Sequence, residues 1–354
     1  MDFTKLFTPA SISARWTENA SNRIPYIGEG FFPVQKKAGL DLSFIKGSKG
    51  LPISLMPSAF DVKSTFRDRI GVSKLETEMP FFKEGFKIKE IDRQNLLRAA
   101  DSNDPYVMSV LNGIYNDADE LIEGAIVASE RERMQLLFPV EGNMGITVVA
   151  NGVTYTYNYD PDGSWKANNY FELTGTAKWS DSSNANPFAD IDTAKQTVLA
   201  RTGANLSIAL MNTATFNYLM NNAKVNARFL SRAAVTVGYL TRRDVASVVE
   251  DTAEIRIVIY DKQFRDENKV AHKYIPDGYV ALLPEGALGN TWYGTTPEEA
   301  DLMASGAAEV ALVNQGIAVK KIVDTDPVNV NTIVSQIVLP SYERMDDVAL
   351  IKVV

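Results

Sequence analysis

Residues 104–138 read DPYVMSVLNGIYNDADELIEGAIVASERERMQLLF, and their pattern predicts one very long helix. Asp104 is a suitable N-cap, Pro105 suits the first helical position, and Pro139 cannot continue a helix. Apolar residues recur at helical spacing, namely at Val107, Leu111, Ile114, Ala118, Leu121, Ala125 and Ala128. Such a helix would span roughly 50 Å. Because an ordinary enzyme of this size rarely needs so long a helix, we interpret it as a structural spine.

The region before this helix is expected to be extended rather than compact. Residues 41–93 are densely charged, offer few side chains for a core of their own, and are punctuated by Pro52, Pro57, Gly71, Pro80 and Gly85. Residues 85–90 alternate with the period of a β-strand. An isolated two-stranded hairpin is only marginally stable, so we expect this region to lie on another surface, most simply on another subunit. Residues 1–40 are irregular, with helical turns expected at 3–7 and 11–20, and fit either an arm across a neighbour or a loosely tethered terminus.

Beyond the long helix, the chain alternates between strand and helix patterns. Residues 146–150 and 153–157 flank Asn151-Gly152, a dipeptide that favours the tight turn of a β-hairpin. Helices are predicted at 190–202, 213–222 and 297–303, and strands at 206–211, 255–260, 279–283, 332–339 and 348–354. Thr213 is the predicted cap of the helix at 213–222. The predicted fold class is therefore mixed α+β.

The composition limits the classes of protein to consider. A length of 354 residues suggests about two domains and is sufficient for a substantial core. The chain contains no cysteine, which excludes disulfides, thiolate metal sites and cysteine nucleophiles. No apolar run approaches about 18 residues, so neither a transmembrane helix nor a membrane partner is expected. The first residues lack the basic and apolar regions of a signal peptide.

The charge of the chain is negative and unevenly distributed. A net charge of −8 disfavours a protein that coats nucleic acid. Residues 1–100 contain 16 Lys and Arg against 11 Asp and Glu, whereas the remaining residues contain 20 against 33. A basic first part and an acidic remainder could attract each other between copies of the chain, but ordinary scatter of surface charge explains the same numbers.

Few residues suggest catalytic or binding chemistry. His272 is the one histidine, and it lies in a charged, turn-like stretch of a chain without a G-x-S-x-G motif, so a Ser-His-Asp arrangement is not expected. The turn at 160–163 lacks the spacing of a calcium loop, and no phosphate-binding glycine loop occurs. We therefore predict no catalytic residue, no metal site and no cofactor. One further set could form a sugar-binding face, although such alternation on a hairpin is more typical of packing pairs: Tyr155, Tyr157, Tyr159, Trp165, Tyr170 and Phe171.

A series of stretches follows the order of a known family. They are Glu130 to Leu137, Trp179-Ser180 with Asn186 to Ile191, Ile275 to Gly278 with Val280 to Pro284, Leu288 to Glu298, and Asp326 to Val328 with Leu339 to Asp347 and the terminal strand. Spread over most of the chain, these stretches resemble the lambda-type phage major capsid proteins, the capsid protein E family. The resemblance implies the Hong Kong 97-type capsid fold, in which an extended hairpin loop and a spine helix precede an axial domain.

The resemblance also implies a division of the chain into domains. The implied parts are an N-terminal arm at 1–45, an extended loop at 46–93, a peripheral domain at 94–145 and 320–354 with the spine helix 104–138, a hairpin insertion at 146–187, and an axial domain at 188–319. In such a fold the arm and the loop lie on neighbouring subunits. The inter-subunit residues implied in the extended loop are Phe60, Phe66, Phe81, Phe82 and Phe86.

The function implied by the resemblance is structural, with no enzymatic activity. The chain resembles the major capsid protein of a tailed bacteriophage or prophage, which self-assembles into the icosahedral shell around packaged double-stranded DNA. Implied partners are other copies in pentamers and hexamers, a separate scaffold protein, a portal, a decoration protein, and DNA contacted non-specifically at the inner wall. The implied location is the virion, with assembly in the host cytoplasm. Alternatives are an encapsulin-like bacterial nanocompartment shell, a phage tail or baseplate protein, and a soluble carbohydrate-binding protein that uses the aromatics near Trp165.

Overall fold

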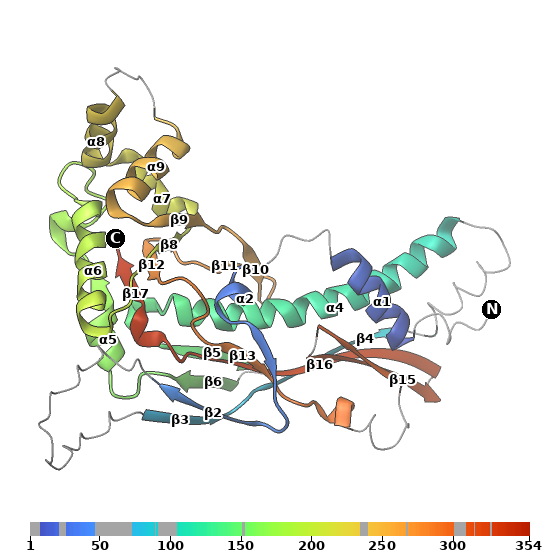
Figure 1. Ribbon diagram of the computed structural model, residues 1–354. Helices are drawn as coiled ribbons and strands as arrows, with labels where there is room; N and C mark the ends of the chain where they lie inside the picture. The colour runs from blue at the N-terminus through green and yellow to red at the C-terminus, as the bar shows by residue number, and fades with distance from the viewer. Residues whose placement is uncertain are drawn as a thin grey trace, which may run out of the picture. The chain divides into compact units, whose positions relative to one another are not determined.

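The computed structural model describes residues 8–20, 26–46, 73–88, 90, 105–150, 153–233, 240–266, 268–300, 309–314, 316–325 and 328–354 (Figure 1). The chain divides into two compact units. Unit 1 comprises Met1–Leu42, Glu76–Arg133 and Asn290–Ser341. Unit 2 comprises Ser43–Leu75, Met134–Gly289 and Tyr342–Val354. Each unit combines segments that are far apart in the sequence, so neither one is a continuous stretch of chain.

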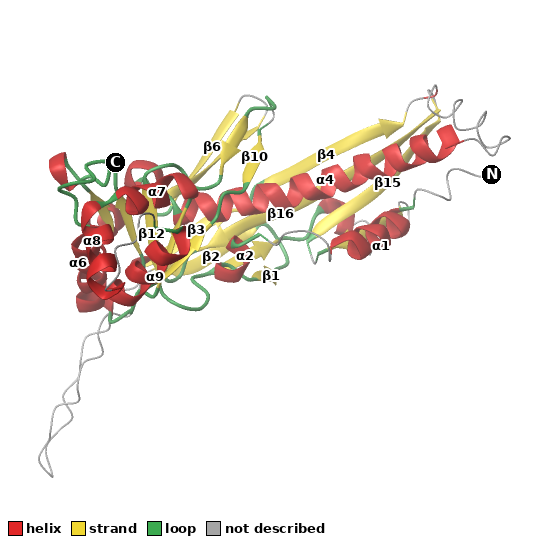
Figure 2. Ribbon diagram, turned by 90° about the horizontal axis from the view of Figure 1, so that it is seen from above, coloured by secondary structure: helices red, strands yellow, loops and turns green. Residues whose placement is uncertain are grey.

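The predicted long helix is present as α4 (Pro105–Leu137), which is 33 residues long (Figure 2). Ala118 and Leu121, which the helical spacing placed on one face, are both buried. The helix ends two residues before Pro139, whose ring supplies no N–H for a further helical hydrogen bond. The predicted cap Asp104 lies outside the described residues.

The sheet of unit 1 is built around one long strand, β16. Its strands are, in chain order, β1 (Val34–Lys36), β4 (Phe81–Ile88), β13 (Asn290–Tyr293), β14 (Glu309–Val313), β15 (Ile317–Thr325) and β16 (Val328–Ser341). On one side β16 pairs antiparallel with β15, which pairs with β14. Strand β16 also pairs antiparallel with β4 through residues 330–337 and with β13 through residues 338–341, and β1 adds in parallel to β13. The length of β16 allows one strand to hold three others in register.

The core of unit 1 lies between this sheet and two helices. Helix α1 (Pro9–Ala20) was expected as helical turns at 11–20, and it packs against β14 and β15. Its Ile12 and Trp16 are buried together with Ile122 of α4 and Val319 of β15. Burial of each large apolar side chain contributes roughly 1.5–3 kcal/mol, which is why this short helix is held on the sheet.

The sheet of unit 2 has five strands, in the order β7-β17-β12-β8-β9. They are β7 (Tyr170–Glu172), β8 (Ile208–Met211), β9 (Arg256–Ile259), β12 (Tyr279–Leu283) and β17 (Ala349–Lys352). Strands β8 and β12 are buried along their whole length, so they lie in the interior of the unit. The terminal strand β17 lies beside β12 in this sheet, whereas the domain division implied by the resemblance groups residues 320–354 together. Complete burial of residues 349–351 explains this position.

Four main helices accompany the sheet of unit 2. They are α6 (Pro187–Thr202), α7 (Thr213–Asn221), α8 (Ala223–Ala233) and α9 (Arg242–Ala253). The cap of α7 is Asn212 and not the predicted Thr213, because the Asn212 carboxamide accepts the backbone N–H of Thr215 at 2.8 Å. The sequence analysis did not predict α8 and α9, nor β13, β14 and β15 of unit 1.

Shorter elements complete the described part of the chain. The predicted hairpin is present as β5 (Gly145–Ala150) and β6 (Val153–Asn158), in antiparallel register. A helix begins at Pro297 as predicted and is described as far as Ala300. The others are α2 (Gly28–Phe31), β2 (Asp41–Lys46), β3 (Ser73–Glu78), α5 (Ser164–Asn169), β10 (Gln263–Arg265), β11 (Ala271–Lys273) and the 3-10 helices Val140–Gly142, Gly175–Ala177 and Met345–Asp347. Within the described residues, no helix combines the length and the apolar character needed to cross a membrane.

Candidate assembly surfaces

Strand β4 carries three of the five phenylalanines that the sequence analysis singled out for contacts between subunits. Phe81 is 45% exposed and Phe86 is 41% exposed, whereas Phe82 is half-buried. Phe60 and Phe66 lie outside the described residues. Large apolar side chains with this exposure, placed on an edge strand, are typical of surfaces that another chain covers.

The register of β4 on β16 shows where these side chains point. Phe86 lies opposite Thr332 and Phe81 lies opposite Ile337. In a strand, successive side chains alternate between the two faces of the sheet, so Phe86 and Phe81 lie on opposite faces. Strand β4 pairs with β16 along one edge, and no strand of the described part of the chain pairs with its other edge. It therefore offers apolar contacts on both faces and backbone groups along one edge.

Strand β4 is supported by its own chain, which changes the expectation that this part of the sequence lies on another subunit. Residues 46–93 were expected to find their supporting surface on another subunit. Residues 81–88 find it in β16 of the same chain, because all eight of them pair with residues 330–337. The expectation of an external surface therefore applies, within residues 81–88, to the exposed side of β4.

Strand β4 is anchored by an ion pair to the segment that follows β13. The ammonium of Lys83 lies 2.5 Å from a carboxylate oxygen of Glu298, and Ser335 of β16 donates to the other oxygen at 3.0 Å. Glu298 is buried, which opposes its ionisation, but hydrogen bonds from Lys83, a backbone N–H and Ser335 outweigh this and lower its pKa. The carboxylate of Glu298 thus remains charged at neutral pH and ties β4 to the unit.

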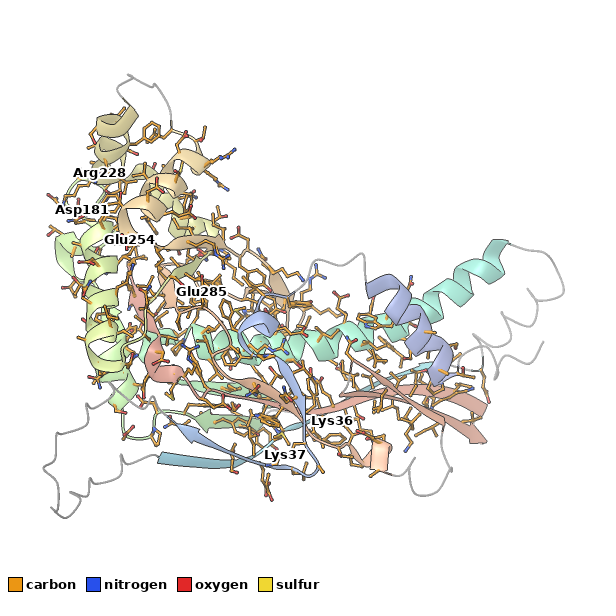
Figure 3. The ribbon with its side chains drawn as sticks, in the orientation of Figure 1. Lys36, Lys37, Asp181, Arg228, Glu254 and Glu285 are labelled. Carbon is orange, nitrogen blue, oxygen red and sulfur yellow. The ribbon has the colours of Figure 1, made fainter. Side chains whose placement is uncertain are left out.

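The neighbouring carboxylate makes the same kind of contact with a different strand. Lys36 of β1 forms an ion pair with the buried Glu299 (Figure 3). The backbone N–H of Glu299 donates to Thr296 Oγ1 at 3.2 Å, as at a capped helix start. Two adjacent acids therefore hold cations from two separate strands. The sequence analysis missed both pairs, because Lys83 and Glu298 are 215 residues apart and no local pattern connects them.

A buried polar network holds the segment around α2 against α4 and β13. The backbone N–H of Gly28 donates to Glu130 Oε1 at 2.9 Å, and a Cβ at position 28 would collide with the Glu130 carboxylate. Arg133 Nε donates to Thr291 Oγ1 at 2.8 Å, and that hydroxyl donates to the carbonyl of Phe32 at 2.8 Å. Because these groups are buried and mutually hydrogen-bonded, the network specifies one position for residues 28–32.

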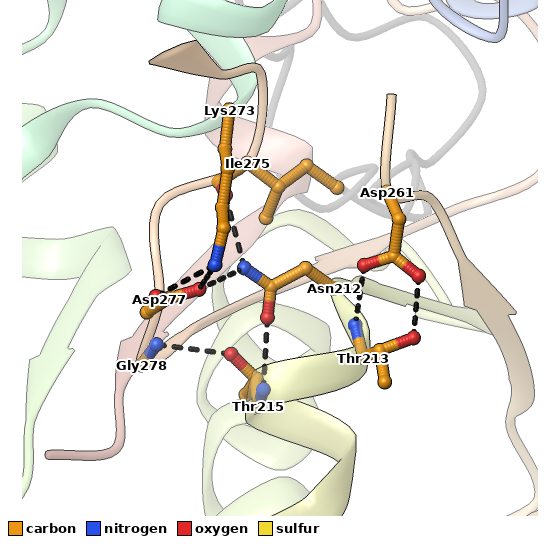
Figure 4. Close-up of polar contacts among 8 residues, drawn as sticks. All are labelled: Asn212, Thr213, Thr215, Asp261, Lys273, Ile275, Asp277 and Gly278. Atoms are coloured by element: carbon orange, nitrogen blue, oxygen red, sulfur yellow. Dashed lines mark hydrogen bonds and ion pairs between the residues drawn. The ribbon is translucent and has the colours of Figure 1, made fainter. Parts of the chain in front are cut away.

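In unit 2, one buried asparagine connects the start of α7 to the turn before β12 (Figure 4). Besides capping α7, Asn212 donates from Nδ2 to the carbonyl of Ile275 at 3.0 Å and to Asp277 Oδ1 at 2.6 Å. The N–H of Gly278 donates to Thr215 Oγ1 at 2.9 Å. These bonds fix the start of α7 and the turn before β12. The resemblance noted in the sequence included residues 275–278, and the structure gives that turn a physical role.

The residues weighed for chemistry lie in ordinary structural positions. His272 lies on the β10–β11 hairpin, where its Nε2 is 2.9 Å from Asp266 Oδ2. Its exposed ring stacks on the ring of Phe264. The carboxylate of Asp160 accepts the N–H groups of Trp165 and Lys166 at the start of α5. In the part of the chain that the structure describes, no group of three or more metal-ligand side chains comes together.

The aromatic set near the hairpin does not form an open sugar-binding face. Trp165 is 1% exposed, and its indole N–H donates to the carbonyl of Met345 at 2.7 Å. Tyr159 is also fully buried. Among the six aromatics named in the sequence analysis, Tyr155 lies on β6 and its side chain is half exposed. Trp165 and Tyr159 are therefore core residues, which removes the platform on which a sugar ring would stack.

Comparisons with known proteins give a consistent result. The model of the family described as phage major capsid protein E matches residues 8–353. A protein described as a prophage capsid protein from E. coli CFT073 has a TM-score of 0.61 at 14% identity, covering 98% of this chain and 99% of that chain. A phage-related protein from Bordetella bronchiseptica has a TM-score of 0.56 at 15% identity, with 96% of each chain covered. The capsid protein of cyanophage A-1(L) has a TM-score of 0.51 at 12% identity, covering 93% of this chain and 92% of that one. No curated protein matches the sequence.

Proposed function

The chain belongs to the phage major capsid protein E family and is a head shell protein with the Hong Kong 97-type fold, and from this premise we propose how its copies assemble. The family match over residues 8–353 carries the functional conclusion, because it covers both compact units. Membership implies self-association into a multimeric shell and a place in the virion. The encapsulin-like and carbohydrate-binding alternatives are not favoured.

The proposed assembly is an icosahedral shell of pentamers and hexamers around packaged double-stranded DNA. A separate scaffold protein, a portal and a decoration protein are the proposed partners, and the host cytoplasm is the proposed site of assembly. DNA would meet the inner wall without specific contacts, which suits a chain of net charge −8. A shell of this kind draws its stability from many shared interfaces.

In this proposal the exposed side of β4 is an inter-subunit contact within the extended loop at 46–93. The exposure of Phe81 and Phe86 supports it, and the Lys83–Glu298 ion pair supplies a fixed base from which the loop extends. The proposed domains keep the boundaries implied by the resemblance: arm 1–45, loop 46–93, peripheral domain 94–145 and 320–354, insertion 146–187 and axial domain 188–319.

The proposed shell function is tested by expressing the full chain alone and with a scaffold protein from the same phage, followed by negative-stain microscopy. We expect shells or rings. A chain that stays a clean monomer under every condition contradicts the function.

The contact at β4 is tested separately with Phe81→Ser and Phe86→Ser in one chain. This variant should fold like the wild type but assemble at least tenfold less, because two apolar contacts are removed from each interface. The matched control, Phe81→Tyr with Phe86→Tyr, keeps the rings and should assemble normally. Normal shells from the serine variant would exclude β4 from the interface while leaving the shell function intact.

A further inference from the structure

Unit 2 contains a surface pocket that none of the contacts above uses. Its volume is about 560 Å³, and it lies between α6 and the end of α9. Its lining consists of Phe188, Ala189, Asp192, Lys195, Gln196, Leu199, Asn205, Thr252, Ala253 and Glu254. Leu199 is 40% exposed although it is a large apolar residue. The pocket therefore combines an exposed apolar side chain with a polar rim, as a site for another protein surface does.

The rim of the pocket is acidic. Asp192 and Glu254 are exposed, and neither forms an ion pair within the described residues. The ammonium of Lys195 lies at the same rim, where it donates to the carbonyls of Ala253 at 2.6 Å and Glu254 at 3.1 Å. Those carbonyls belong to the end of α9, where a cation stabilises the helix. The rim therefore carries two carboxylates and one ammonium, an excess of one negative charge.

Helix α8 presents a face with the opposite charge. Ala223, Ala227 and Ser231 form the middle of its exposed side, with Leu230, which is 44% exposed, along one edge. Arg228 lies on the other edge, and its guanidinium has no hydrogen bond or ion pair in the described part of the chain. The small residues of the middle permit close approach of another surface, and Lys224, whose ammonium donates to the carbonyl of Asn184 at 2.7 Å, lies beside Arg228 on the same face.

We propose that the exposed face of α8 of one copy docks into the α6–α9 pocket of the next copy. Arg228 would meet Asp192 and Glu254, and Leu230 would lie against Leu199. Arg228 lies on α8 and Glu254 at the end of α9 (both labelled in Figure 3), and Arg228 is not among the pocket residues. Because the two patches differ, the contact is heterologous, and repetition of a heterologous contact by rotation closes a ring. This inference rests on the proposed shell function and names the contact that forms its rings.

A second copy is the occupant that the charges favour. The acidic rim and the unpaired arginine occur on the same chain, so every copy carries both halves of the contact. Opposite charges across an interface also set orientation and exclude a like-charged approach, such as two α8 faces meeting each other.

The first test uses the absence of cysteine from the chain, which makes introduced thiols unique. Ala227→Cys and Gln196→Cys are placed on the full chain, in the middle of the α8 face and in the pocket. After treatment of assembled particles with a short bismaleimide, the double variant should give a ladder of covalent oligomers in denaturing gels. Each single variant should remain monomeric, and an equal mixture of the two single variants should give dimers. Crosslinking of Ala227→Cys alone, or assembled particles without a ladder, would overturn the proposal.

The second test reverses the charges. Arg228→Glu and Glu254→Arg should each lower the yield of shells or rings at least tenfold, and the combined variant should recover to within about threefold of the wild type. Lys269→Glu and Glu285→Arg are matched controls on exposed positions of unit 2 and should assemble normally. Unfolding curves confirm that each variant is folded.

The outcomes separate this contact from the function on which it depends. If the wild type assembles and the reversed variants assemble equally well, or if the combined variant is no better than the single ones, the docking of α8 into the pocket is wrong and the shell function stands. If the wild type forms neither rings nor shells, the shell function is wrong and this contact with it.

Discussion

Three charged residues near the end of α4 are buried in unit 1, and they differ in their partners. Glu130 accepts the N–H of Gly28, and Arg133 donates to Thr291. Glu132 is 2% exposed, and neither of its carboxylate oxygens has a hydrogen-bond partner within the described residues. Burial raises its pKa well above the ordinary value of 4.5, although Arg133 and Arg131 act in the opposite direction. Glu132 therefore stays protonated at pH values where exposed carboxyls are ionised.

We predict that Glu132→Gln reduces the loss of stability that the subunit shows as the pH rises. A carboxyl whose pKa is raised in the folded state makes its full contribution to the free energy of unfolding below the unfolded pKa of about 4.3. That contribution is lost as the pH rises through the folded pKa. Glutamine mimics the protonated acid at every pH. The variant should therefore be more stable than the wild type at pH 8, by about 1–3 kcal/mol, in urea unfolding of the subunit.

Glu120→Gln is the control for this prediction, because Glu120 is exposed on the same helix. It should leave the dependence of the unfolding free energy on pH unchanged. A Glu132→Gln variant whose unfolding free energy follows pH as the wild type does would show that the acid is not held in its protonated form.

Glu298 gives a prediction of the opposite sign. Its pKa is lowered, so its contribution is present above the ordinary value of 4.5 and is lost as the pH falls through the lower folded value. We expect Glu298→Gln to weaken the attachment of β4 by about 1–2 kcal/mol at pH 7, a modest figure because Lys83 is partly exposed. Amide exchange of residues 81–88 measures this: protection in the wild type should fall in acid, and the variant should be equally weak at both pH values. Equal protection in both proteins at pH 7 would contradict it.

The sequence predicts some of these residues and not others, for a physical reason. Phe81 and Phe86 were implied as inter-subunit residues by the resemblance, and that role stays a prediction. The contacts of Glu298 were not predicted, since an ion pair depends on two segments that meet only after the sheet has formed. Glu132 has the same limitation, because its burial depends on what packs against α4.

Among the elements, those with strong local signals were predicted. Helix α4 has regular apolar spacing and a terminating proline, and the β5–β6 hairpin has its Asn-Gly dipeptide. Strands β14 and β15 lack such signals, and they form through pairing, β15 with β16 and β14 with β15. Tertiary contacts rather than local propensity define these two strands. Helix α8, by contrast, separates its polar and apolar residues by face, a local signal that the sequence analysis did not use.

The start of α7 allows a direct comparison of the predicted cap with the observed one. Asn212→Ala removes the cap and two buried hydrogen bonds, to Ile275 and Asp277, so we expect unit 2 to lose about 2–4 kcal/mol of stability. Thr213→Ala removes a hydrogen bond to Asp261 at a partly exposed position and should cost less than about 1 kcal/mol. Denaturant unfolding of the two variants measures both. A larger loss from Thr213→Ala would restore the cap that the sequence suggested.

The connectivity of the whole molecule is where local patterns give least information. The six-stranded sheet combines residues 34–36 with residues 328–341, and the five-stranded sheet combines residues 170–172 with the terminal strand. Strand periodicity predicts that such segments pair, but not with which partner. The resemblance supplied the fold class, and the family match confirms it, whereas the proposed domain boundaries remain a prediction.

A deletion distinguishes folding of the subunit from assembly of the shell. Residues 47–72 lie outside the described residues and belong to the proline-punctuated, densely charged stretch whose sequence offers few side chains for a core of its own. We predict that replacing 47–72 by a short Gly/Ser linker leaves the midpoint of thermal unfolding within about 3 °C of the wild type, because a loop change alters mainly the closure entropy. The same variant, co-expressed with a scaffold protein, should form no shells, because the extended loop would no longer reach a neighbour. A second variant with a Gly/Ser linker of the original length separates the role of the side chains from that of chain length, and it should also fold and fail to assemble. Loss of folding would place this segment in a core of its own subunit, and normal shells would show that the extended loop is not needed to join the copies.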